Sequence, residues 1–455
     1  MSTKQFDLIV LGSGPAGSSI AKESAAMGHR VAAIESREFG GTCALRGCNP
    51  KKVYVNASAA VDRVRRGDGR LVNDQGVTID WKQLHDFKRQ FTQPVRERSR
   101  QSFDDAGIDT FVGSPRFLSP DRLTVGGNEL VARRIAISTG ARPRPLEFEG
   151  EEFVIGSDTF LDLETMPRQV VFIGGGYVSM EFAHVVARYG ADVRVVERGD
   201  RLLAGFDPDL TSLLQSFSES VGIRFSMNAE VCRVTKLESG KLRVWLKNTG
   251  AGKESLDCDL VVHGAGRIPN LQGLDLGAGN VDVADDGVCV NEYFQSQSNH
   301  AVFAAGDCAA SAHPKLTPSA NEQARIVIKN LFSDSFVAIP KHHAIPIVAF
   351  TTPAIASIGL SEVEARQRVD NLSVRFDDVS TWGSVRKTGE TVAAYKVLID
   401  ESNDRIVGAH LLGPAAEETI NLFALAMSHQ LTASDLKSTL FSFPTFASDV
   451  RRMLG

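Results

Sequence analysis

The chain has 455 residues, a formal net charge of −5, a hydrophobic fraction of 43% and six cysteines. A length above that of a single core predicts several domains. The charge is near balance and forms no basic stripe, which argues against nucleic acid as a partner. The cysteines are too sparse for a secreted disulfide scaffold, and we see neither a leader with an apolar core nor an apolar run long enough for a membrane span. We therefore expect a cytoplasmic protein with no membrane partner.

The first motif in the chain is a nucleotide-binding fingerprint. Residues 7–11 predict a buried parallel strand, residues 12–17 read Gly-Ser-Gly-Pro-Ala-Gly, and a helix is predicted as far as Met27. A second predicted strand over 30–34 is followed by Glu35. The glycines of such a motif allow a tight turn, close approach of the backbone to a pyrophosphate and close helix packing, and the acid accepts hydrogen bonds from a ribose. We predict a dinucleotide site here.

Two cysteines follow in the run Gly-Gly-Thr-Cys-Ala-Leu-Arg-Gly-Cys-Asn-Pro-Lys-Lys of residues 40–52. Cys43 and Cys48 are five positions apart, a rise of about 7.5 Å in an ideal helix. This exceeds the roughly 7 Å Cα separation that an unstrained disulfide tolerates, so a helical segment must be distorted for the pair to close. Two unrelated buried thiols are the alternative. The flanking glycines, proline and lysines favour a redox-active pair in a reducing compartment.

A second glycine motif repeats the first. A predicted strand over 170–173 leads into Gly174-Gly175-Gly176-Tyr177-Val178-Ser179, then a helix, a strand over 192–196 and Glu197. Glu197 follows Gly174 by 23 residues, the interval that separates Glu35 from Gly12. Two unrelated glycine turns would seldom share this spacing. We predict two dinucleotides in one chain, with electron transfer between them.

Further motifs come in a fixed order: Ser138-Thr139-Gly140, Gly266-Arg267-Ile268-Pro269-Asn270, Ala305-Gly306-Asp307, the stretch 346–361 and Val407-Gly408-Ala409-His410. With the two fingerprints and the cysteine run, they make the chain resemble the class I pyridine nucleotide–disulfide oxidoreductases. This is the group of glutathione reductase, dihydrolipoamide dehydrogenase and mercuric reductase. The resemblance covers essentially the full length.

The resemblance implies an α/β fold with two Rossmann-like dinucleotide-binding domains and a C-terminal α+β dimerisation domain. The FAD domain would comprise residues 1–145 and 271–336, the NAD(P) domain residues 146–270, and the interface domain residues 337–455. It also implies a homodimer in which the interface domain completes each active site across the two-fold axis. Thr317 would begin the helix that leads toward that domain.

The resemblance further assigns the cofactor-binding residues, and it assigns no metal ligands. The positions that match the FAD site are Gly12, Gly14, Gly17, Glu35, Thr42, Thr139, Gly140 and Asp307. The positions that match the NAD(P) site are Gly174, Gly176, Tyr177, Glu197, Arg198 and Arg267.

The catalytic assignments follow the same resemblance. Cys48, nearer the flavin, would be the charge-transfer thiol, and Cys43 would be the interchange thiol that meets the substrate. We expect the pKa of Cys43 to be lowered by nearby positive charge or a helix N-terminus. Lys52 and Glu181 match an ion pair beside flavin N5, where the lysine stabilises the reduced flavin and the carboxylate offsets the burial of its charge.

The C-terminal segment departs from the family pattern. The disulfide reductases carry a His-Pro-Thr-x-x-Glu stretch there that supplies an acid–base dyad, whereas this chain has Phe443 and Ser448 at those positions. Asp449 is one residue out of register, about 100° around a helix. Acid–base help is worth roughly 10²–10⁴-fold, so we expect poor turnover of glutathione or lipoamide disulfides. No cysteine follows Cys308, which disfavours mercury reduction.

These features predict an FAD-dependent NAD(P)H:disulfide or thiol oxidoreductase of atypical substrate range, acting on a small-molecule disulfide or thiol-type substrate. One alternative is a diaphorase or a reductase of a non-disulfide acceptor. Another is an enzyme like the ketopropyl-coenzyme M oxidoreductase/carboxylase, which cleaves a thioether. That branch shares the phenylalanine but has histidine where this chain has Ser448. The sequence does not name the substrate.

The choice between NADH and NADPH depends on neighbouring residues that favour different cofactors. Glu197 favours free ribose hydroxyls and would repel a 2′-phosphate. Arg198 matches an arginine of NADPH-using relatives, but the second arginine position is Ala204. We favour NADH.

Overall fold

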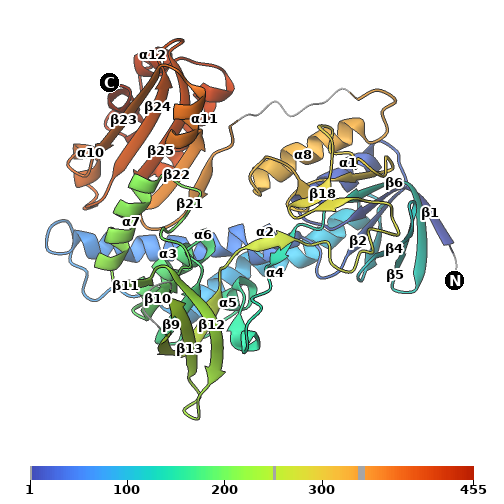
Figure 1. Cartoon of the computed structure of the whole chain (residues 1–455), viewed down its shortest axis with the longest axis horizontal. Coiled ribbons are helices and arrows are strands. Elements are labelled where there is room, and N and C mark those ends of the chain that lie inside the picture. The colour runs from blue at the N-terminus through green and yellow to red at the C-terminus, as the bar shows by residue number, and fades with distance from the viewer. Residues whose placement is uncertain (1–2, 249–252, 337–343) are drawn as a thin grey trace. The chain divides into compact units, whose positions relative to one another are not determined.

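The computed structural model describes residues 3–248, 253–336 and 344–455, and it contains two compact units (Figure 1). Unit 1 comprises residues 1–51, 87–144 and 267–341, and unit 2 comprises residues 52–86, 145–266 and 342–455. The start of the predicted interface domain, residues 337–343, lies outside the described residues. The three-domain division with its boundaries stays a prediction.

Unit 1 is built on a sheet whose centre is parallel. β1 (Thr3–Leu11) pairs in parallel with β2 (Val31–Glu35) and with β6 (Asn128–Ile137). The predicted strand over 7–11 lies within β1, and its last four residues are fully buried. Such a continuous apolar run is typical of a strand covered on both faces. The other strands are β3 (Asp109–Val112), β4 (Arg116–Ser119), β5 (Arg122–Val125) and β19 (Val302–Ala304), and the order is β3-β2-β1-β6-β5-β4 with β19 beside β6.

Helices α1 (Pro15–Ala26) and α8 (Thr317–Asn330) lie side by side in unit 1 (Figure 1). The helix predicted to reach Met27 thus ends one residue earlier, and the helix predicted at Thr317 begins there. The smaller elements of the unit are α2 (Gly41–Arg46), β7 (Ala141–Pro143), β16 (Arg267–Pro269), β17 (Val283–Ala284), β18 (Gly287–Cys289) and β20 (Ala309–Ala310).

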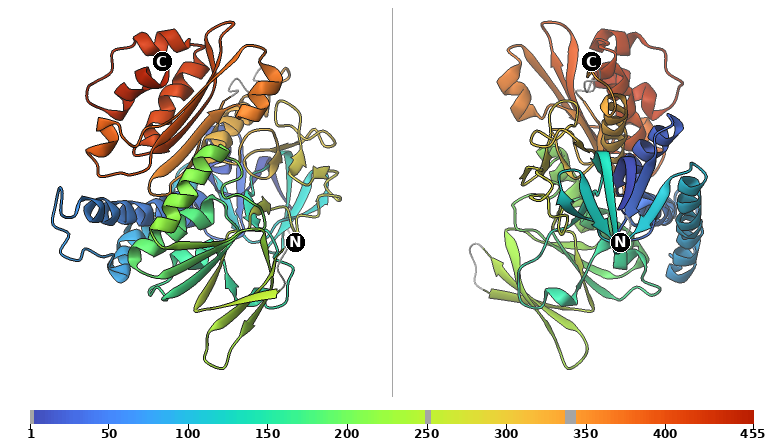
Figure 2. Two further views of the ribbon diagram at one scale, coloured as in Figure 1. Left: turned by 60° about the vertical axis from the view of Figure 1, so that its left-hand side comes forward. Right: turned by 90° about the vertical axis from the view of Figure 1, so that its right-hand side faces the viewer.

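Unit 2 contains a second parallel sheet with the order β11-β10-β9-β15-β8. Its strands are β8 (Val154–Ile155), β9 (Gln169–Ile173), β10 (Asp192–Val196), β11 (Ile223–Ser226) and β15 (Leu260–His263). Helix α6 (Tyr177–Tyr189) follows β9, as the second fingerprint predicts. An antiparallel sheet is added by β12 (Ala229–Lys236), β13 (Leu242–Asn248) and β14 (Lys253–Cys258), seen from two directions in Figure 2. The remaining elements of this region are η1 (Glu151–Phe153), α5 (Ser157–Leu161) and α7 (Pro208–Ser220).

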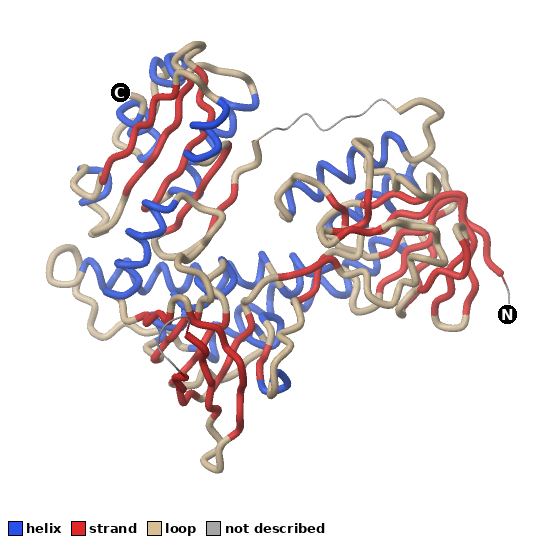
Figure 3. Tube along the Cα trace, viewed as in Figure 1, coloured by secondary structure: helices blue, strands red, loops and turns tan. Residues whose placement is uncertain are grey.

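The C-terminal part of unit 2 is an antiparallel sheet with helices, drawn in red and blue in Figure 3. Its strand order is β21-β22-β25-β24-β23. The strands are β21 (Ile347–Ala349), β22 (Ala354–Gly359), β23 (Leu372–Asp378), β24 (Ala394–Asp400) and β25 (Arg405–Gly413). The helices are α9 (Glu362–Arg368), α10 (Gly383–Arg386), α11 (Ala416–Ser428), α12 (Ala433–Ser438) and α13 (Phe446–Met453), of which α11 packs on β22 and β25.

Two long helices, α3 (Cys48–Gly67) and α4 (Trp81–Asp104), contribute residues to both units. Both are rich in charged residues, and Pro94 lies inside α4. Among the residues that the structure describes, no helix is both long enough and apolar enough to cross a membrane.

Candidate active site

The first fingerprint forms a turn that only glycine fits. Gly12 has a φ of +101°, and a Cβ atom on it would lie 2.3 Å from the carbonyl oxygen of Ser138. A Cβ atom on Gly17 would lie 2.1 Å from the carbonyl oxygen of Gly12. The hydroxyl of Ser138 is buried in this turn and has no hydrogen-bond partner among the described residues. A bare backbone turn with a buried polar group fits the pyrophosphate of a dinucleotide.

The predicted acids flank this turn in unit 1. Glu35 ends β2, and its Oε2 accepts hydrogen bonds from the backbone N–H and the hydroxyl of Ser13, at 3.1 and 2.7 Å. Burial raises the pKa of Asp307, an effect that Arg267 and Lys315 oppose. These carboxylates fit the ribose and ribityl hydroxyls of FAD, which would hydrogen-bond to them.

Arg267, assigned to the nicotinamide dinucleotide, lies in β16 of unit 1, and its guanidinium donates to the carbonyl of Ala141. The structure therefore places Arg267 in a different unit from the second fingerprint.

Of the remaining FAD candidates, Thr42 is exposed in the first turn of α2, and Gly140 accepts a backbone hydrogen bond from Asn270 at 2.9 Å. Thr139, which is half-buried and has a buried hydroxyl oxygen, precedes it after β6.

The cysteine run packs directly on the first fingerprint. A Cβ atom on Gly41 would lie 2.4 Å from the Cα atom of Gly14, so the two backbones approach as closely as glycine permits. The N–H of Gly40 donates to the hydroxyl of Ser13 at 3.0 Å. The position of α2, which carries Cys43, is therefore tied to the turn that would hold the pyrophosphate.

The cysteine segment is helical but interrupted. α2 ends at Arg46, Gly47 has the non-helical angles φ −136° and ψ −115°, and α3 begins at Cys48. A break of this kind is the distortion that closure of the pair would need. The two cysteines are not joined by a disulfide in the structure, with Cys43 half-buried and Cys48 exposed, so the disulfide stays a prediction.

Thr317 is a member of the site that the sequence did not reveal as such. Its hydroxyl donates to Cys43 Sγ at 3.2 Å and lies 3.9 Å from Cys48 Sγ. It is the first residue of α8, which the sequence did predict as a helix start. Because Thr317 and Cys43 are 274 residues apart, no local pattern indicates this contact.

The expected lowering of the Cys43 pKa is wrong for this arrangement. The hydrogen bond with Cys48 and burial raise the pKa of the Cys43 thiol, while the Thr317 hydroxyl acts in the opposite direction. The nearby positive charge of Arg46 is paired with Glu38. Burial and the second sulfur outweigh the charges that the sequence places next to the cysteine.

The structure brings Lys52 and Glu181 together. Lys52 Nζ lies 2.8 Å from Glu181 Oε2, and the Glu181 side chain is only 1% exposed. Lys52 belongs to α3, four residues after Cys48, and Glu181 belongs to α6. The second oxygen of Glu181 accepts a hydrogen bond from the N–H of Phe350 at 3.0 Å. A buried carboxylate is thus compensated by an ammonium and a peptide group.

The second fingerprint makes a similar turn in unit 2. Here the close contact at the third fingerprint position requires a glycine at 264, outside the fingerprint. Gly174 has a φ of +93°, and a Cβ atom on it would lie 2.8 Å from the carbonyl oxygen of Gly264. A Cβ atom on Gly264 would lie 1.9 Å from Ser179 Oγ. Glycine at 264 therefore leaves room for serine in the third fingerprint position. Gly176 precedes α6 at the N-cap, where a Cβ atom would meet nothing closer than 3.8 Å.

The residues expected to select the nucleotide lie at the ends of α6 and β10. Glu197 follows β10, and its two oxygens accept from the N–H groups of Gly175 and Gly199 at 2.5 and 2.7 Å. Arg198 is exposed. Tyr177 begins α6 and is 43% exposed.

The C-terminal segment presents no ionisable group at the two positions in question. Phe443 is 86% exposed. Thr445 is the N-cap of α13, and Ser448 is its N3 residue, each donating a backbone N–H to the other's hydroxyl at 3.2 Å. Ser448 thus serves the start of a helix, as a capping-box residue does.

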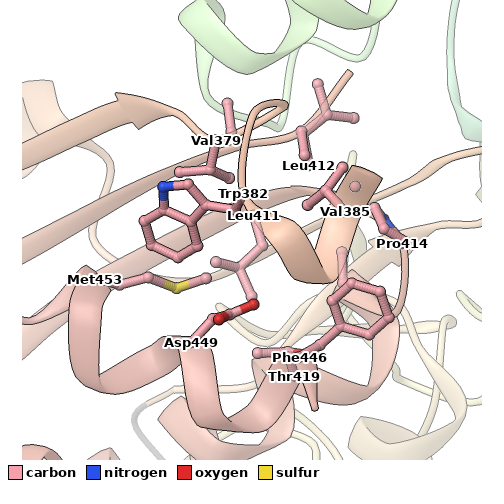
Figure 4. A pocket seen from close by; sticks show the side chains of 14 residues that line it. Val379, Trp382, Val385, Leu411, Leu412, Pro414, Thr419, Phe446, Asp449 and Met453 are labelled. Atoms are coloured by element: carbon pink, nitrogen blue, oxygen red, sulfur yellow. The ribbon is translucent and has the colours of Figure 1, made fainter. Parts of the chain in front are cut away.

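Asp449 lies apart from those two positions. It lines a pocket in the C-terminal part of unit 2, where its carboxylate is seen near Trp382, Leu411 and Met453 (Figure 4). That Asp449 is a poor substitute for a glutamate at 448 stays a prediction.

The sequence pattern of the pyridine nucleotide–disulphide oxidoreductases matches residues 6–324, and that of their dimerisation domain matches residues 345–454. The chain belongs to the pyridine nucleotide–disulphide oxidoreductase family. Membership confirms the α/β fold class and makes the protein a pyridine nucleotide-dependent flavoprotein disulfide oxidoreductase, with FAD and NAD(P)H as the cofactors that the family implies.

Relatives of this family cover nearly all of the chain. It is 32% identical over 450 residues to a glutathione reductase of Burkholderia cepacia, spanning 99% of this chain and 98% of the relative. It is 27% identical over 455 residues to a dihydrolipoyl dehydrogenase of Bacillus subtilis, spanning 98% and 97%. It is 26% identical over 450 residues to a mercuric reductase of Lysinibacillus sphaericus, spanning 98% and 81%.

The same fold is found in a solved structure. The HOCl-induced flavoprotein disulfide reductase RclA from Escherichia coli superposes with a TM-score of 0.87 at 24% identity, spanning 98% of this chain and 99% of that one. The likeness supports the architecture of this family member.

Proposed function

We propose that this oxidoreductase passes electrons from NAD(P)H through a redox-active Cys43–Cys48 pair to a small-molecule disulfide, without a positioned acid or base. One observation carries the proposal. The Thr317 hydroxyl lies 3.2 Å from Cys43 Sγ and 3.9 Å from Cys48 Sγ, next to a fingerprint that fits FAD. Two unrelated buried thiols would not need a hydroxyl from a distant helix.

The chemistry that FAD supplies when bound is acceptance of a hydride from NAD(P)H and delivery of two electrons to a disulfide. Gly12, Gly14 and Gly17 would hold its pyrophosphate, with Glu35 and Asp307 at its hydroxyls. Lys52 would stabilise negative charge beside the ring, and Glu181 would hold the lysine in place.

The exchange with substrate is carried out by the cysteines. The Cys43 thiolate attacks one sulfur of the substrate disulfide, which breaks the S–S bond, forms a mixed disulfide and releases the first substrate thiolate. The Cys48 thiolate then attacks the Cys43 sulfur, releasing the second substrate thiolate and forming the Cys43–Cys48 disulfide again. Each turnover moves two electrons from NAD(P)H to the substrate.

The released thiolates would take their protons from solvent, because neither Phe443 nor Ser448 can donate one. A leaving thiolate with a low pKa departs without that help. The proposed substrate class is therefore disulfides whose thiols are acidic, such as aryl disulfides, in preference to alkyl disulfides.

We propose NADH as the reductant. Both oxygens of Glu197 are held by backbone N–H groups at the end of β10. A carboxylate fixed in this way would accept hydrogen bonds from ribose hydroxyls and repel a 2′-phosphate.

We propose a homodimer as the working form. The segment before α13 exposes two large apolar side chains, Leu440 at 87% and Phe443 at 86%. Exposed apolar residues that gather in one segment of a dimerisation domain are suited to burial against a second copy.

The absence of an ionisable side chain at positions 443 and 448 also favours a second candidate, a reductase of a non-disulfide acceptor or of a thioether. An acceptor that receives electrons from the flavin alone would not need Cys43, whereas thioether cleavage would need the thiol but no disulfide substrate.

The test is an anaerobic titration with NADH and with NADPH, followed by turnover of a panel of disulfides. Long-wavelength thiolate–flavin absorbance in the reduced enzyme, with faster reduction by NADH, is the expected result. Disulfide turnover should disappear in C43S. Absence of that absorbance from a folded, flavin-loaded protein, or acceptor reduction that survives C43S unchanged, would favour a reductase of a non-disulfide acceptor. Thioether cleavage that C43S abolishes, in an enzyme that turns over no disulfide, would favour a thioether-cleaving enzyme.

A further inference from the structure

Phe350 contacts both members of the Lys52–Glu181 ion pair. It follows β21, and its backbone N–H donates to Glu181 Oε1 at 3.0 Å. Its ring lies under the lysine, with Lys52 Nζ 3.7 Å from the ring centroid. Lys52 Nζ is also 2.8 Å from the other oxygen of Glu181. The ammonium therefore lies between a carboxylate and an aromatic face.

The backbone that carries Phe350 is anchored a second time, two residues later. The N–H of Thr352 donates to His184 Nδ1 at 3.2 Å, and Arg188 donates to the carbonyl oxygen of Thr352 at 3.0 Å. Arg188 is in turn bound by Asp62 of α3 at 2.8 Å. The helices that supply Lys52 and Glu181 thus also fix the segment 350–352 between them.

The ring itself has little packing role. Phe350 is only half-buried, and it belongs to none of the buried apolar clusters formed by the described residues, although its neighbour Ala349 does. Since the backbone of Phe350 is fixed and its ring face is turned to the Lys52 ammonium, contact with that ammonium is the main interaction of the ring. The electrostatic attraction of a cation to a ring face is directional, so it restricts the long lysine side chain as well as attracting it.

We propose that Phe350 is a positioning residue for Lys52 and that it sets the rate at which the flavin is reduced. This inference rests on the proposed role of Lys52. The ring limits the rotamers of the lysine and holds its ammonium at a fixed point, while the peptide N–H of the same residue orients Glu181. Position, rather than charge alone, determines how well a fixed group stabilises charge that develops during reaction.

The test compares F350L with wild type in the flavin-loaded enzyme. Flavin reduction by NADH under anaerobic conditions is followed by stopped flow, and the midpoint potential of the bound flavin is measured. Loss of a cation–π contact predicts a reduction rate that is lower by about two- to thirty-fold and a more negative potential. F350W keeps an aromatic face and should retain a rate near that of wild type.

The matched control is F376L. Phe376 is another ring that faces a lysine of unit 2, with Lys396 Nζ 5.6 Å from its centroid, and it is 47% exposed. The same substitution there removes a similar contact away from the Lys52–Glu181 pair. Flavin reduction in F376L should equal that of wild type.

A double-mutant cycle with K52M separates positioning from packing. Because Phe350 is proposed to act through Lys52, F350L should add no further slowing in the K52M background. Equal slowing by F350L in both backgrounds, or a wild-type rate in F350L when K52M is slow, would overturn the inference. A wild-type rate in K52M itself would refute the proposed role of Lys52 instead. Should F350L lose its flavin, F350M supports the same comparison, since it keeps the volume and lacks the ring.

Discussion

The cysteine segment and the C-terminal segment of this protein differ in the contacts that hold them. Around Cys43, glycine backbones pack at the limit of contact and Thr317 donates to the sulfur across 274 residues of sequence. Around Phe443, an apolar ring is exposed and the nearby Ser448 is used to cap α13. The first segment is held by contacts with distant residues. The second segment keeps the capping box that starts α13, and neither Phe443 nor Ser448 carries an ionisable side chain.

The difference shows that folding and chemistry are separable at position 448. A capping box needs a side-chain acceptor at N3, and glutamate is the residue that commonly provides it. Serine satisfies that demand through its hydroxyl, which accepts from the Thr445 N–H at 3.2 Å. The helix can therefore begin normally whether or not a carboxylate is present for catalysis.

The largest effect is expected from replacing Cys43 in the cysteine segment. C43S removes the proposed nucleophile, and we predict that disulfide turnover falls by about 10³-fold or more. Reduction of the flavin by NADH should continue, because this step precedes the cysteines. Steady-state turnover and stopped-flow reduction measure the two. C232S, at an exposed cysteine outside the Cys43–Cys48 pair, is the matched control and should behave as wild type.

The next largest effect is expected from introducing an acid–base pair into the C-terminal segment. The double variant F443H/S448E restores an acid–base pair, and we predict about a 10²-fold gain in turnover of alkyl disulfides. A bell-shaped pH profile with one limb near the histidine pKa should accompany it. S448E alone keeps the helix cap and should give little gain. A folded, flavin-loaded double variant without any gain would show that proton delivery is not what limits the enzyme.

A smaller effect is expected from removing the Thr317 hydroxyl, which donates to Cys43 Sγ. The thiol must lose its proton to attack, and burial and Cys48 already raise its pKa. T317V removes the donor that opposes this rise, so the pKa should go higher and the thiolate fraction at neutral pH should fall. We predict turnover about tenfold lower near pH 7, with the difference closing as the pH rises. T317S keeps the hydroxyl and should resemble wild type, and a pH-independent loss in T317V would point to packing instead.

The smallest effect concerns Ser448 as a structural residue. S448A removes one half of the capping box, and we predict a loss of about 0.5–1 kcal/mol in the free energy of unfolding. Disulfide turnover should not change, because the hydroxyl takes no part in the exchange. Denaturant unfolding and steady-state kinetics on the same samples check both statements. A fall in turnover without a loss of stability would assign Ser448 a chemical role.

The sequence predicted the features that depend on neighbouring residues. The strand at residues 7–11 and the helices after both fingerprints follow from local apolar runs and glycines, and the helix start at Thr317 follows from the resemblance. The direction of the Cys43 pKa shift was wrongly predicted, because Arg46 is paired with Glu38 and because the hydrogen bond with Cys48 and burial raise the pKa. The contacts of Thr317 with Cys43 and of Phe350 with Lys52 join distant segments, and no spacing rule shows such contacts.

The most direct test of the central claim, electron transfer without a positioned acid, is the dependence of turnover on the leaving thiol. Disulfides with thiols of increasing pKa are compared at constant pH by kcat/KM. The account predicts a steady fall as the thiol pKa rises, and a shallower fall in F443H/S448E, where a proton is supplied. Equal kcat/KM for aryl and alkyl disulfides in the wild-type enzyme would contradict it, because some other group would then be protonating the leaving thiolate.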